Sequence, residues 1–274
     1  MSKLRGRRVL VTGGAGGIGQ CLATELGRAG NEIIITDING DALERAATEL
    51  RALGAVVHTR RMDVSDRAAV EDLARWIEGE LGGLDVLVNN AGIGHTGEIA
   101  ETSVETWHKL MNVNFWGPLY HVYAFLPAMV RRRAGHIVNV SSGQAFFQLP
   151  TWGPYAAVKL ALGGFSEILR YELRKHGIAV TTVYPFMVDT GFYGDIKGDT
   201  WGQRLSMRLV PYYSMRPDKV AHIIFKAIEH RKGVEMVSPL NDVAKQLRAI
   251  PGATNFVSTL SMLFLGRGKS QAHR

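Results

Sequence analysis

Residues Val9 to Gly19 read VLVTGGAGGIG, and this stretch decides the fold. Its apolar beginning, Val9 to Val11, has the β-branched character of a buried strand, and the glycines that follow allow a sharp turn into a helix. Such glycines also let backbone N–H groups approach a pyrophosphate, whose charge the helix N-terminus complements. A glycine-rich turn alone is weak evidence, because glycines often only tighten a turn. With a strand before it and a helix after it, this turn predicts a dinucleotide site with contacts from Gly13, Gly16, Gly17, Ile18 and Gly19.

An acidic residue stands at the distance from this turn that a nucleotide site requires. Asp37 follows the apolar run Ile33 to Ile35. A carboxylate at the end of the second strand can accept hydrogen bonds from both ribose hydroxyls of an adenosine and repels a 2′-phosphate, which selects NAD over NADP. The alternative is that Asp37 caps the next helix, although Asn39 or Asp41 would serve as well. We favour the ribose role and expect Ile38 to contact the cofactor beside it.

The rest of the chain alternates short apolar runs with segments of helical periodicity, as at 42–53 and 68–81. Apolar strands separated by helices of this length predict a parallel sheet that is covered by helices on both faces. We therefore expect an α/β protein, a single Rossmann-type doubly wound domain over residues 1–274. Its further strands are expected at Val56-Val57, Val86 to Val88, Ile137-Val138, Val180 to Val183 and Val234 to Val237.

Two segments depart from this alternation. Between 190 and 217, Gly, Asp, Trp and Tyr mix without a period, and such a stretch in a compact domain is typical of a functional element, here a substrate lid. Residues 241–274 form a C-terminal extension with an apolar segment at 256–265 and a basic tail. We expect this segment to pack on the domain or to contact another subunit. The alternative is that this segment lies on a membrane surface. A stretch of ten residues that contains three hydroxyl-bearing side chains is a poor membrane anchor.

The composition narrows the classes of function. With 274 residues, 46% of them hydrophobic, the chain can bury a large core. The net charge is +7, but the cations are scattered, at Arg5 to Arg8, Arg131 to Arg133 and the C-terminus, so we expect a solvated surface and no nucleic-acid partner. The single cysteine, Cys21, excludes an intrachain disulfide and fits a reducing, cytoplasmic setting. No apolar run reaches the length of a membrane span, and no His or acid grouping has metal-site spacing.

A second group of residues indicates acid–base chemistry. Tyr155 and Lys159 lie four residues apart at the head of a long apolar segment, which places both side chains on one face of a helix. An ammonium beside a phenol favours the phenolate and lowers the tyrosine pKa toward the range of an acid–base catalyst. This spacing is common by chance, but the strand-like run Ile137 to Val140 ends upstream in Ser141-Ser142. Hydroxyls at the carboxyl end of a strand lie where open α/β sheets bind ligands.

With these motifs the sequence resembles the short-chain dehydrogenase/reductase (SDR) family over about residues 7–240. Tyr155 and Lys159 match the family's Tyr-x-x-x-Lys, and Ser142 has the family serine's spacing to the tyrosine. Asn114 matches the family's catalytic asparagine, because the family's glycine follows three residues later. The resemblance implies that Tyr155 exchanges a proton with the substrate oxygen and that Ser142 orients this oxygen. It further implies that Lys159 binds the nicotinamide ribose and that Asn114 holds a water of the proton relay.

The resemblance also extends the expected cofactor site. The glycine turn matches the family's Thr-Gly-x-x-x-Gly-x-Gly. Residues 89–92 read NNAG, a segment that binds adenosine and stabilises the sheet in the family, and Asp63-Val64 matches the pair that reaches the adenine ring. Val188 and Thr190 match positions that contact the nicotinamide carboxamide. The resemblance therefore adds to the expected cofactor residues Asp63, Val64, Asn90, Ala91, Gly92, Tyr155, Lys159, Val188 and Thr190.

One position departs from the family pattern: Pro185 is followed by Phe186, where the family typically has glycine. The ring could narrow the substrate pocket, stack near the nicotinamide or only alter the turn. Aromatic side chains around the expected cleft favour an apolar alcohol or ketone, such as a steroid, terpenoid or lipid-like molecule, with ordinary core packing as the alternative. The expected substrate-side residues are Ser142, Phe146, Phe147, Trp152, Phe186 and Met187.

These observations predict an NAD(H)-dependent alcohol dehydrogenase or carbonyl reductase. The alternative is a nucleotide-binding regulatory protein of the same fold with little turnover. The presence of all four family residues, Asn114, Ser142, Tyr155 and Lys159, argues against this alternative. The resemblance also implies a homodimer or homotetramer, formed through helices that here span 115–133 and 155–176.

Overall fold

The computed structural model describes residues 4–146, 149–190 and 214–238, together with Asn241, Val243 and Gln246. All the strands that the sequence predicts fall within these residues. Phe147, most of the expected lid at 190–217 and nearly all of the expected extension at 241–274 lie outside them.

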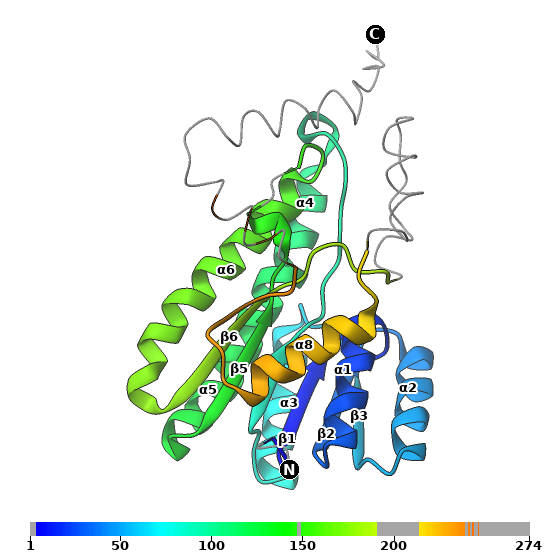
Figure 1. The fold of residues 1–274 in the computed structure, drawn as a ribbon, viewed down its shortest axis with the longest axis vertical. Helices are drawn as coiled ribbons and strands as arrows, with labels where there is room; N and C mark the ends of the chain where they lie inside the picture. Colours follow the sequence, from blue (N-terminus) through cyan, green and yellow to red (C-terminus); the bar gives the residue numbers. More distant parts are fainter. Residues whose placement is uncertain are drawn as a thin grey trace.

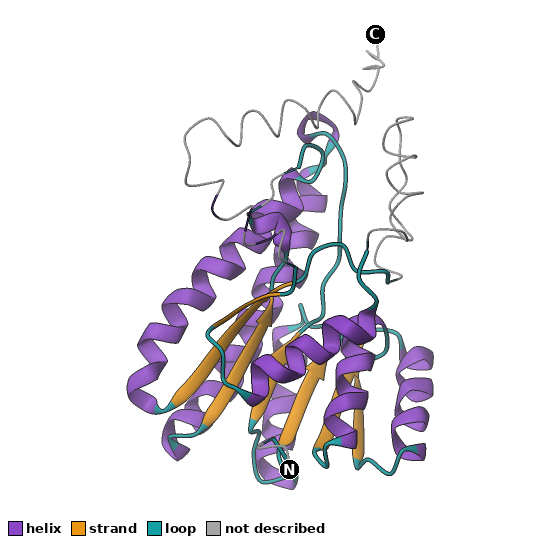
Figure 2. Cartoon of the chain, viewed as in Figure 1, coloured by secondary structure: helices purple, strands orange, loops and turns teal. Residues whose placement is uncertain are grey.

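The predicted strands join one parallel sheet, drawn in orange in Figure 2. Its order is β3-β2-β1-β4-β5-β6-β7, so the chain builds outward from β1 on one side and then adds β4 to β7 on the other. This is a doubly wound arrangement, which confirms the predicted fold class. The strands are β1 (Arg8–Thr12), β2 (Glu32–Asp37), β3 (Val57–Arg61), β4 (Val86–Asn89), β5 (Gly135–Val140), β6 (Ile178–Tyr184) and β7 (Val234–Met236).

Helices cover both faces of the sheet, as Figure 1 shows. Successive side chains of a strand point to opposite faces, so Val9 and Val11 enter one hydrophobic core and Leu10 enters the other. The first core is closed by α1 (Gly17–Arg28), α2 (Gly40–Ala52) and α8 (Pro217–Glu229). The second is closed by α3 (Arg67–Glu80), α5 (Gly117–Arg132) and α6 (Gly153–Leu173), and α4 (Val104–Met111) lies near α6.

Helix boundaries follow local chemistry. The side chain of Asn39 accepts the Ala42 N–H at 3.1 Å and caps α2, and Asp66 caps α3 in the same way. The helix predicted from 155 begins at Gly153 because Pro154 fits the first helical turn. The helix predicted from 115 begins as an α-helix only at Gly117, because a π-helical stretch that the sequence pattern did not reveal occupies Asn112–Trp116.

The strand order places the candidate site. β1 and β4 are neighbours, but the chain leaves them toward opposite sides of the sheet, which opens a crevice at their carboxyl ends. The carboxyl ends of β5 and β6 extend this crevice. None of the helices in the described part of the chain combines the length and apolar character of a membrane span.

Candidate active site

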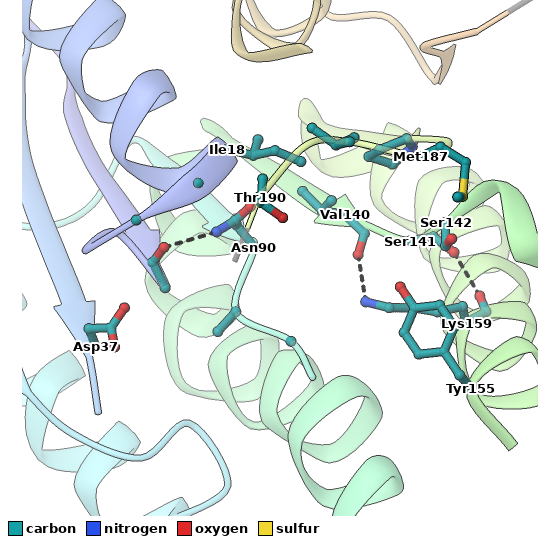
Figure 3. Close-up of a pocket in the computed structure, with 17 residues that line it drawn as sticks. Ile18, Asp37, Asn90, Val140, Ser141, Ser142, Tyr155, Lys159, Met187 and Thr190 are labelled. Atoms are coloured by element: carbon teal, nitrogen blue, oxygen red, sulfur yellow. Dashed lines mark hydrogen bonds between the residues drawn. The ribbon is translucent and has the colours of Figure 1, made fainter. Parts of the chain in front are cut away.

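A pocket of about 400 Å³ opens at these strand ends (Figure 3). Most of the residues expected from the sequence line it: Gly13, Gly16, Gly17, Ile18, Asp37, Asn90, Ala91, Gly92, Ser142, Tyr155, Lys159, Val188 and Thr190. Met187 lines it as well. The structure therefore brings together residues that are spread over nearly 180 positions of the chain.

The glycine turn leaves the N-terminus of α1 open to this pocket. The N-cap is Gly16, which offers no side chain to the first-turn N–H groups, and the first turn contains no acidic residue. By contrast, α2 and α3 are capped by side-chain oxygens. Gly13 and Gly17 adopt φ angles of 64° and 54°, which only glycine adopts without strain. An uncapped helix N-terminus of this kind fits an anion such as the pyrophosphate of a dinucleotide.

The expected cofactor residues also hold one another. The side chain of Asn90 donates hydrogen bonds to the carbonyls of Thr12 and Gly13 at 3.0 and 3.1 Å, which ties the segment after β4 to the glycine turn. Gly19 does not line the pocket; a Cβ there would overlap the Gly13 carbonyl, so its expected role becomes close packing of the turn on α1. Gly92 is required because a Cβ would lie 2.7 Å from Asn114 Oδ1.

Asp37 lies at the opposite end of the pocket from Tyr155, as Figure 3 shows. Its carboxylate accepts the Ala15 N–H at 3.3 Å and the Asn39 N–H at 3.0 Å. The cap of α2 is supplied by Asn39 rather than by Asp37, so the capping alternative does not describe this carboxylate. Backbone N–H groups therefore hold the Asp37 carboxylate at the pocket, and its contact with an adenosine ribose remains a prediction.

Three further residues expected to contact the cofactor do not line the pocket. Ile38 is 62% exposed at the surface beside Asp37. The Asp63 carboxylate accepts hydrogen bonds from the N–H and hydroxyl of Ser65, both at 2.8 Å, and so forms a turn before α3. Val64 is buried and packs against Gly117. Their contacts with a cofactor remain predictions.

At the other end, Tyr155 and Lys159 lie on one face of α6, as their spacing predicts. The Lys159 ammonium lies 5.8 Å from the centre of the Tyr155 ring and donates to the Val140 carbonyl at 3.0 Å. Burial lowers the pKa of Lys159 to about 8. The Ser141 hydroxyl donates to the Lys159 carbonyl at 2.7 Å, so the end of β5 holds the helical turn that carries this lysine.

Ser142 faces the pocket next to these two residues (Figure 3). Its hydroxyl oxygen accepts the Gln144 N–H at 3.2 Å, which leaves the hydroxyl proton for donation to a ligand. The sequence analysis did not include Val140, Ser141 and Pro185 in the site, although they line the pocket. The available signal was their position, because Ser141 and Pro185 directly precede residues that were included and Val140 precedes Ser141.

Asn114 does not line the pocket, and its side chain is occupied. Its amide group donates to the carbonyls of Ile93 and Leu110 at 3.0 and 3.1 Å, and its oxygen accepts the Ile93 N–H. Asn114 lies in the π-helical stretch, and the residue four positions on is Pro118, which has no N–H. An i+4 partner for the Asn114 carbonyl is therefore missing, and in a π-helical turn the matching donor is the N–H of Leu119. The contact of Asn114 with the expected water remains a prediction.

The expected substrate-side aromatics pack around the site rather than into it. The Trp152 ring meets the Tyr155 ring edge-on, with 5.6 Å between centroids. Phe186 lies against the residue after Ser142, since a Cβ added at Gly143 would be 2.7 Å from its Cδ2. Met187 reaches the pocket instead, with a left-handed φ of 46°. Phe186 thus packs behind the pocket wall without lining the pocket. Phe147 lies outside the described residues.

Within the described residues, no three His, Cys, Asp or Glu side chains are grouped so that they could hold a metal ion. The half-buried Cys21 of α1 packs against the core, and burial raises the pKa of its thiol.

Comparison with known proteins gives the class. Residues 7–200 match the family model described as short chain dehydrogenase. The chain is 36% identical to EphD of Mycobacterium tuberculosis over 84% of its own length and 41% of EphD, so it spans less than half of that relative. It is 32% identical to mouse 17-beta-hydroxysteroid dehydrogenase 13, covering 90% of this chain and 79% of the relative.

A crystal structure of a short chain dehydrogenase/reductase from Burkholderia phymatum in complex with NAD is also similar. It superposes with a TM-score of 0.84 and 29% sequence identity, covering 91% of this chain and 95% of the other. The chain described here belongs to the short-chain dehydrogenase/reductase family of oxidoreductases. This membership confirms the resemblance on which the expected site was built.

Proposed function

We propose that the chain transfers a hydride between a nicotinamide cofactor, NAD(H), and an apolar alcohol or ketone. One observation carries the proposal: a single pocket joins an uncapped helix N-terminus and Asp37 at one end to Ser142, Tyr155 and Lys159 at the other. The solved relative with NAD bound supports the choice of cofactor. Bound NAD or NADH supplies the hydride chemistry, and the protein supplies orientation and proton transfer.

At the cofactor end, the first-turn N–H groups of α1 bind the pyrophosphate and Asp37 binds the adenosine ribose. Val188 and Thr190 line the pocket beyond the glycine turn and contact the carboxamide. The Lys159 ammonium binds the second ribose and stabilises negative charge on Tyr155. These contacts fix the reacting carbon of the nicotinamide next to Ser142 and Tyr155.

At the substrate end, Ser142 donates a hydrogen bond to the substrate oxygen and holds it against Tyr155. During ketone reduction, the Tyr155 hydroxyl gives its proton to the oxygen while the hydride adds to the carbonyl carbon; oxidation runs both steps in reverse. Asn114 holds a water that returns the proton to Tyr155. Ser142, Tyr155 and Lys159 are the catalytic residues, with Asn114 completing the relay.

An apolar substrate is supported by the Met187 side chain in the pocket wall and by Trp152 and Phe186 behind it. The name of the mouse relative, a hydroxysteroid dehydrogenase, points to the same substrate class. A regulatory nucleotide-binding protein is the alternative. A panel of sterols, hydroxy-lipids and aliphatic alcohols or ketones, followed by NADH absorbance, separates the two, because only an enzyme produces or consumes NADH.

We further propose a homodimer or homotetramer built through α5 and α6, in a reducing, cytoplasmic setting. Large apolar side chains are exposed on or just before these helices, with Trp116 at 40%, Tyr123 at 71% and Ile168 at 58%. Exposed apolar groups on adjacent helices are typical of a subunit interface. Light scattering is expected to give a multiple of the 30.1 kDa chain mass, and the mass of a single chain would contradict this interface.

Wild-type protein should bind NADH at least about tenfold more tightly than NADPH, because Asp37 repels the 2′-phosphate. Asp37→Ala should narrow this preference by weakening NADH binding. Asp41→Ala removes an exposed carboxylate from the first turn of α2 and should leave the preference unchanged. Titration of the intrinsic fluorescence with each cofactor measures the affinities. Equal or tighter binding of NADPH to the wild type would refute the role of Asp37.

Tyr155→Phe should lower kcat by about 10² to 10⁴-fold, because it removes the group that exchanges the proton. NADH affinity should stay within a few-fold, since the ring remains. Tyr184→Phe is the matched control: burial raises the pKa of Tyr184 to about 12, and this residue does not line the pocket. Steady-state rates on a substrate from the panel measure the effect. Wild-type turnover in Tyr155→Phe would reject the mechanism.

A further inference from the structure

Three neighbouring loops at the amino-terminal ends of the strands, opposite the pocket, are strongly basic. They comprise residues 130–136, 170–178 and 226–234, which lead into the adjacent strands β5, β6 and β7. Together these stretches carry nine Lys or Arg residues and two Glu residues. The corresponding helices α5, α6 and α8 end toward the lower edge of the molecule in Figure 1, whereas the strands point their carboxyl ends upward. Cations that are far apart in the sequence are therefore gathered at one end of the fold.

Arginine side chains connect the three loops directly. The Arg231 guanidinium donates to the carbonyls of Gly135 and Gly177 at 3.2 and 3.0 Å, and Arg133 donates to the Lys175 carbonyl at 2.9 Å. Arg133 and Arg231 adopt φ angles of 51° and 50°, a left-handed conformation that favours glycine. Arginine at these strained positions is explained by the bonds it makes across the loops. The result is one continuous surface rather than three separate loop tips.

These bonds leave the positive charge of the loops uncompensated, because carbonyl groups are neutral. Among the described residues, five cations of the loops form no ion pair, and we call them the basic edge: Arg131, Arg133, Arg174, Lys175 and Arg231. A helix C-terminus carries only about half a negative charge, so three helix ends and the exposed Glu172, which forms no ion pair among the described residues, offset about half of the five positive charges. Burial, and secondarily the charge of Arg231, lowers the pKa of His136 to about 3, so this neighbouring imidazole stays neutral.

The side chains around the basic edge are amphipathic. Tyr171 is 60% exposed and Val234 is 38% exposed. The Arg170 guanidinium lies 4.7 Å from the centre of the Tyr171 ring and donates to its hydroxyl at 3.2 Å. One face of this ring is therefore covered, which disfavours stacking against a nucleic-acid base. Tyrosine and arginine at an exposed apolar margin are instead typical of the interface between a membrane and water.

We propose that the basic edge docks on an anionic lipid bilayer, with its cations among the lipid headgroups. Each Lys or Arg near such a surface strengthens binding by about fivefold, so five cations are enough for reversible attachment without any inserted helix. The pocket opens at the other end of the strands and stays accessible to cofactor and substrate in this orientation. The proposal does not rest on the proposed catalytic function, because none of the five cations lines the pocket.

Co-sedimentation with vesicles tests the proposal. The docking variant combines Arg131→Glu, Arg174→Glu and Lys175→Glu, three exposed cations whose side chains make no hydrogen bond or ion pair that the described fold needs. The control variant combines Arg45→Glu, Lys109→Glu and Lys219→Glu, which are also exposed, form no ion pair among the described residues and lie on α2, α4 and α8. Both variants change the net charge equally. If the docking variant does not fold, Gln replaces Glu at the same positions in both variants.

Wild-type protein should bind phosphatidylcholine vesicles containing about 30% phosphatidylserine at about 0.1 M salt and leave them as the salt is raised. The docking variant should bind more than about 100-fold more weakly, and the control variant should stay within about threefold of the wild type. NADH affinity should be the same in all three proteins, which separates this test from that of the proposed function. Four results would overturn the proposal: no binding to the charged vesicles, equal binding to pure phosphatidylcholine, equal losses in both variants, or tighter binding of duplex DNA than of vesicles.

Discussion

Two buried hydrogen bonds between the end of β5 and α6 are the constraint on which the site depends. The Ser141 hydroxyl donates to the Lys159 carbonyl, and the Lys159 ammonium donates back to the Val140 carbonyl. Together they fix the helical turn that carries Lys159 against the strand end that carries Ser142. Deeper in the core, Asn139 of β5 donates to the Ser166 hydroxyl of α6, about two helical turns beyond Lys159. A rigid strand-to-helix join of this kind holds Ser142 and Lys159, two of the proposed catalytic residues, in one geometry before any ligand binds.

This join carries a cost in stability. A buried ammonium is expensive, and its burial lowers the pKa of Lys159 to about 8. The ammonium faces the pocket, whose other end is an uncapped helix N-terminus, and we propose that a bound dinucleotide satisfies both groups. Destabilising groups that a ligand can satisfy are typical of functional sites. The fold places them at opposite ends of one crevice because β1 and β4 are adjacent and diverge.

Much of this arrangement could be predicted from the sequence, because it depends on local patterns. Apolar runs alternating with helical segments predict the sheet, and Tyr155 and Lys159 share a helix face by spacing alone. What escaped prediction depends on contacts between distant segments. The Phe186 ring lies against Gly143, where a side chain would leave it no space. The Asn114 amide group donates a hydrogen bond to the Ile93 carbonyl and is not available to a ligand. The cations looked scattered in the sequence, and only the order of β5, β6 and β7 brings those of three loops together.

If the hydrogen bonds between β5 and α6 set the geometry of the proposed catalytic residues, Ser141→Ala and Ser166→Ala should differ in turnover. Each variant removes one buried serine hydroxyl that donates to a carbonyl of α6, so Ser141→Ala should lose about 1–2 kcal/mol of unfolding free energy. Ser166→Ala should lose at least as much, because it also removes the acceptor of the Asn139 amide. Only Ser141 holds the turn of Lys159. Ser141→Ala should lower kcat by about tenfold and weaken NADH binding by a few-fold, because Lys159 is displaced from Tyr155 and from the ribose, whereas Ser166→Ala should stay within about twofold of the wild type in both. Wild-type kcat in Ser141→Ala, or equal losses in both variants, would contradict this role of the hydrogen bonds.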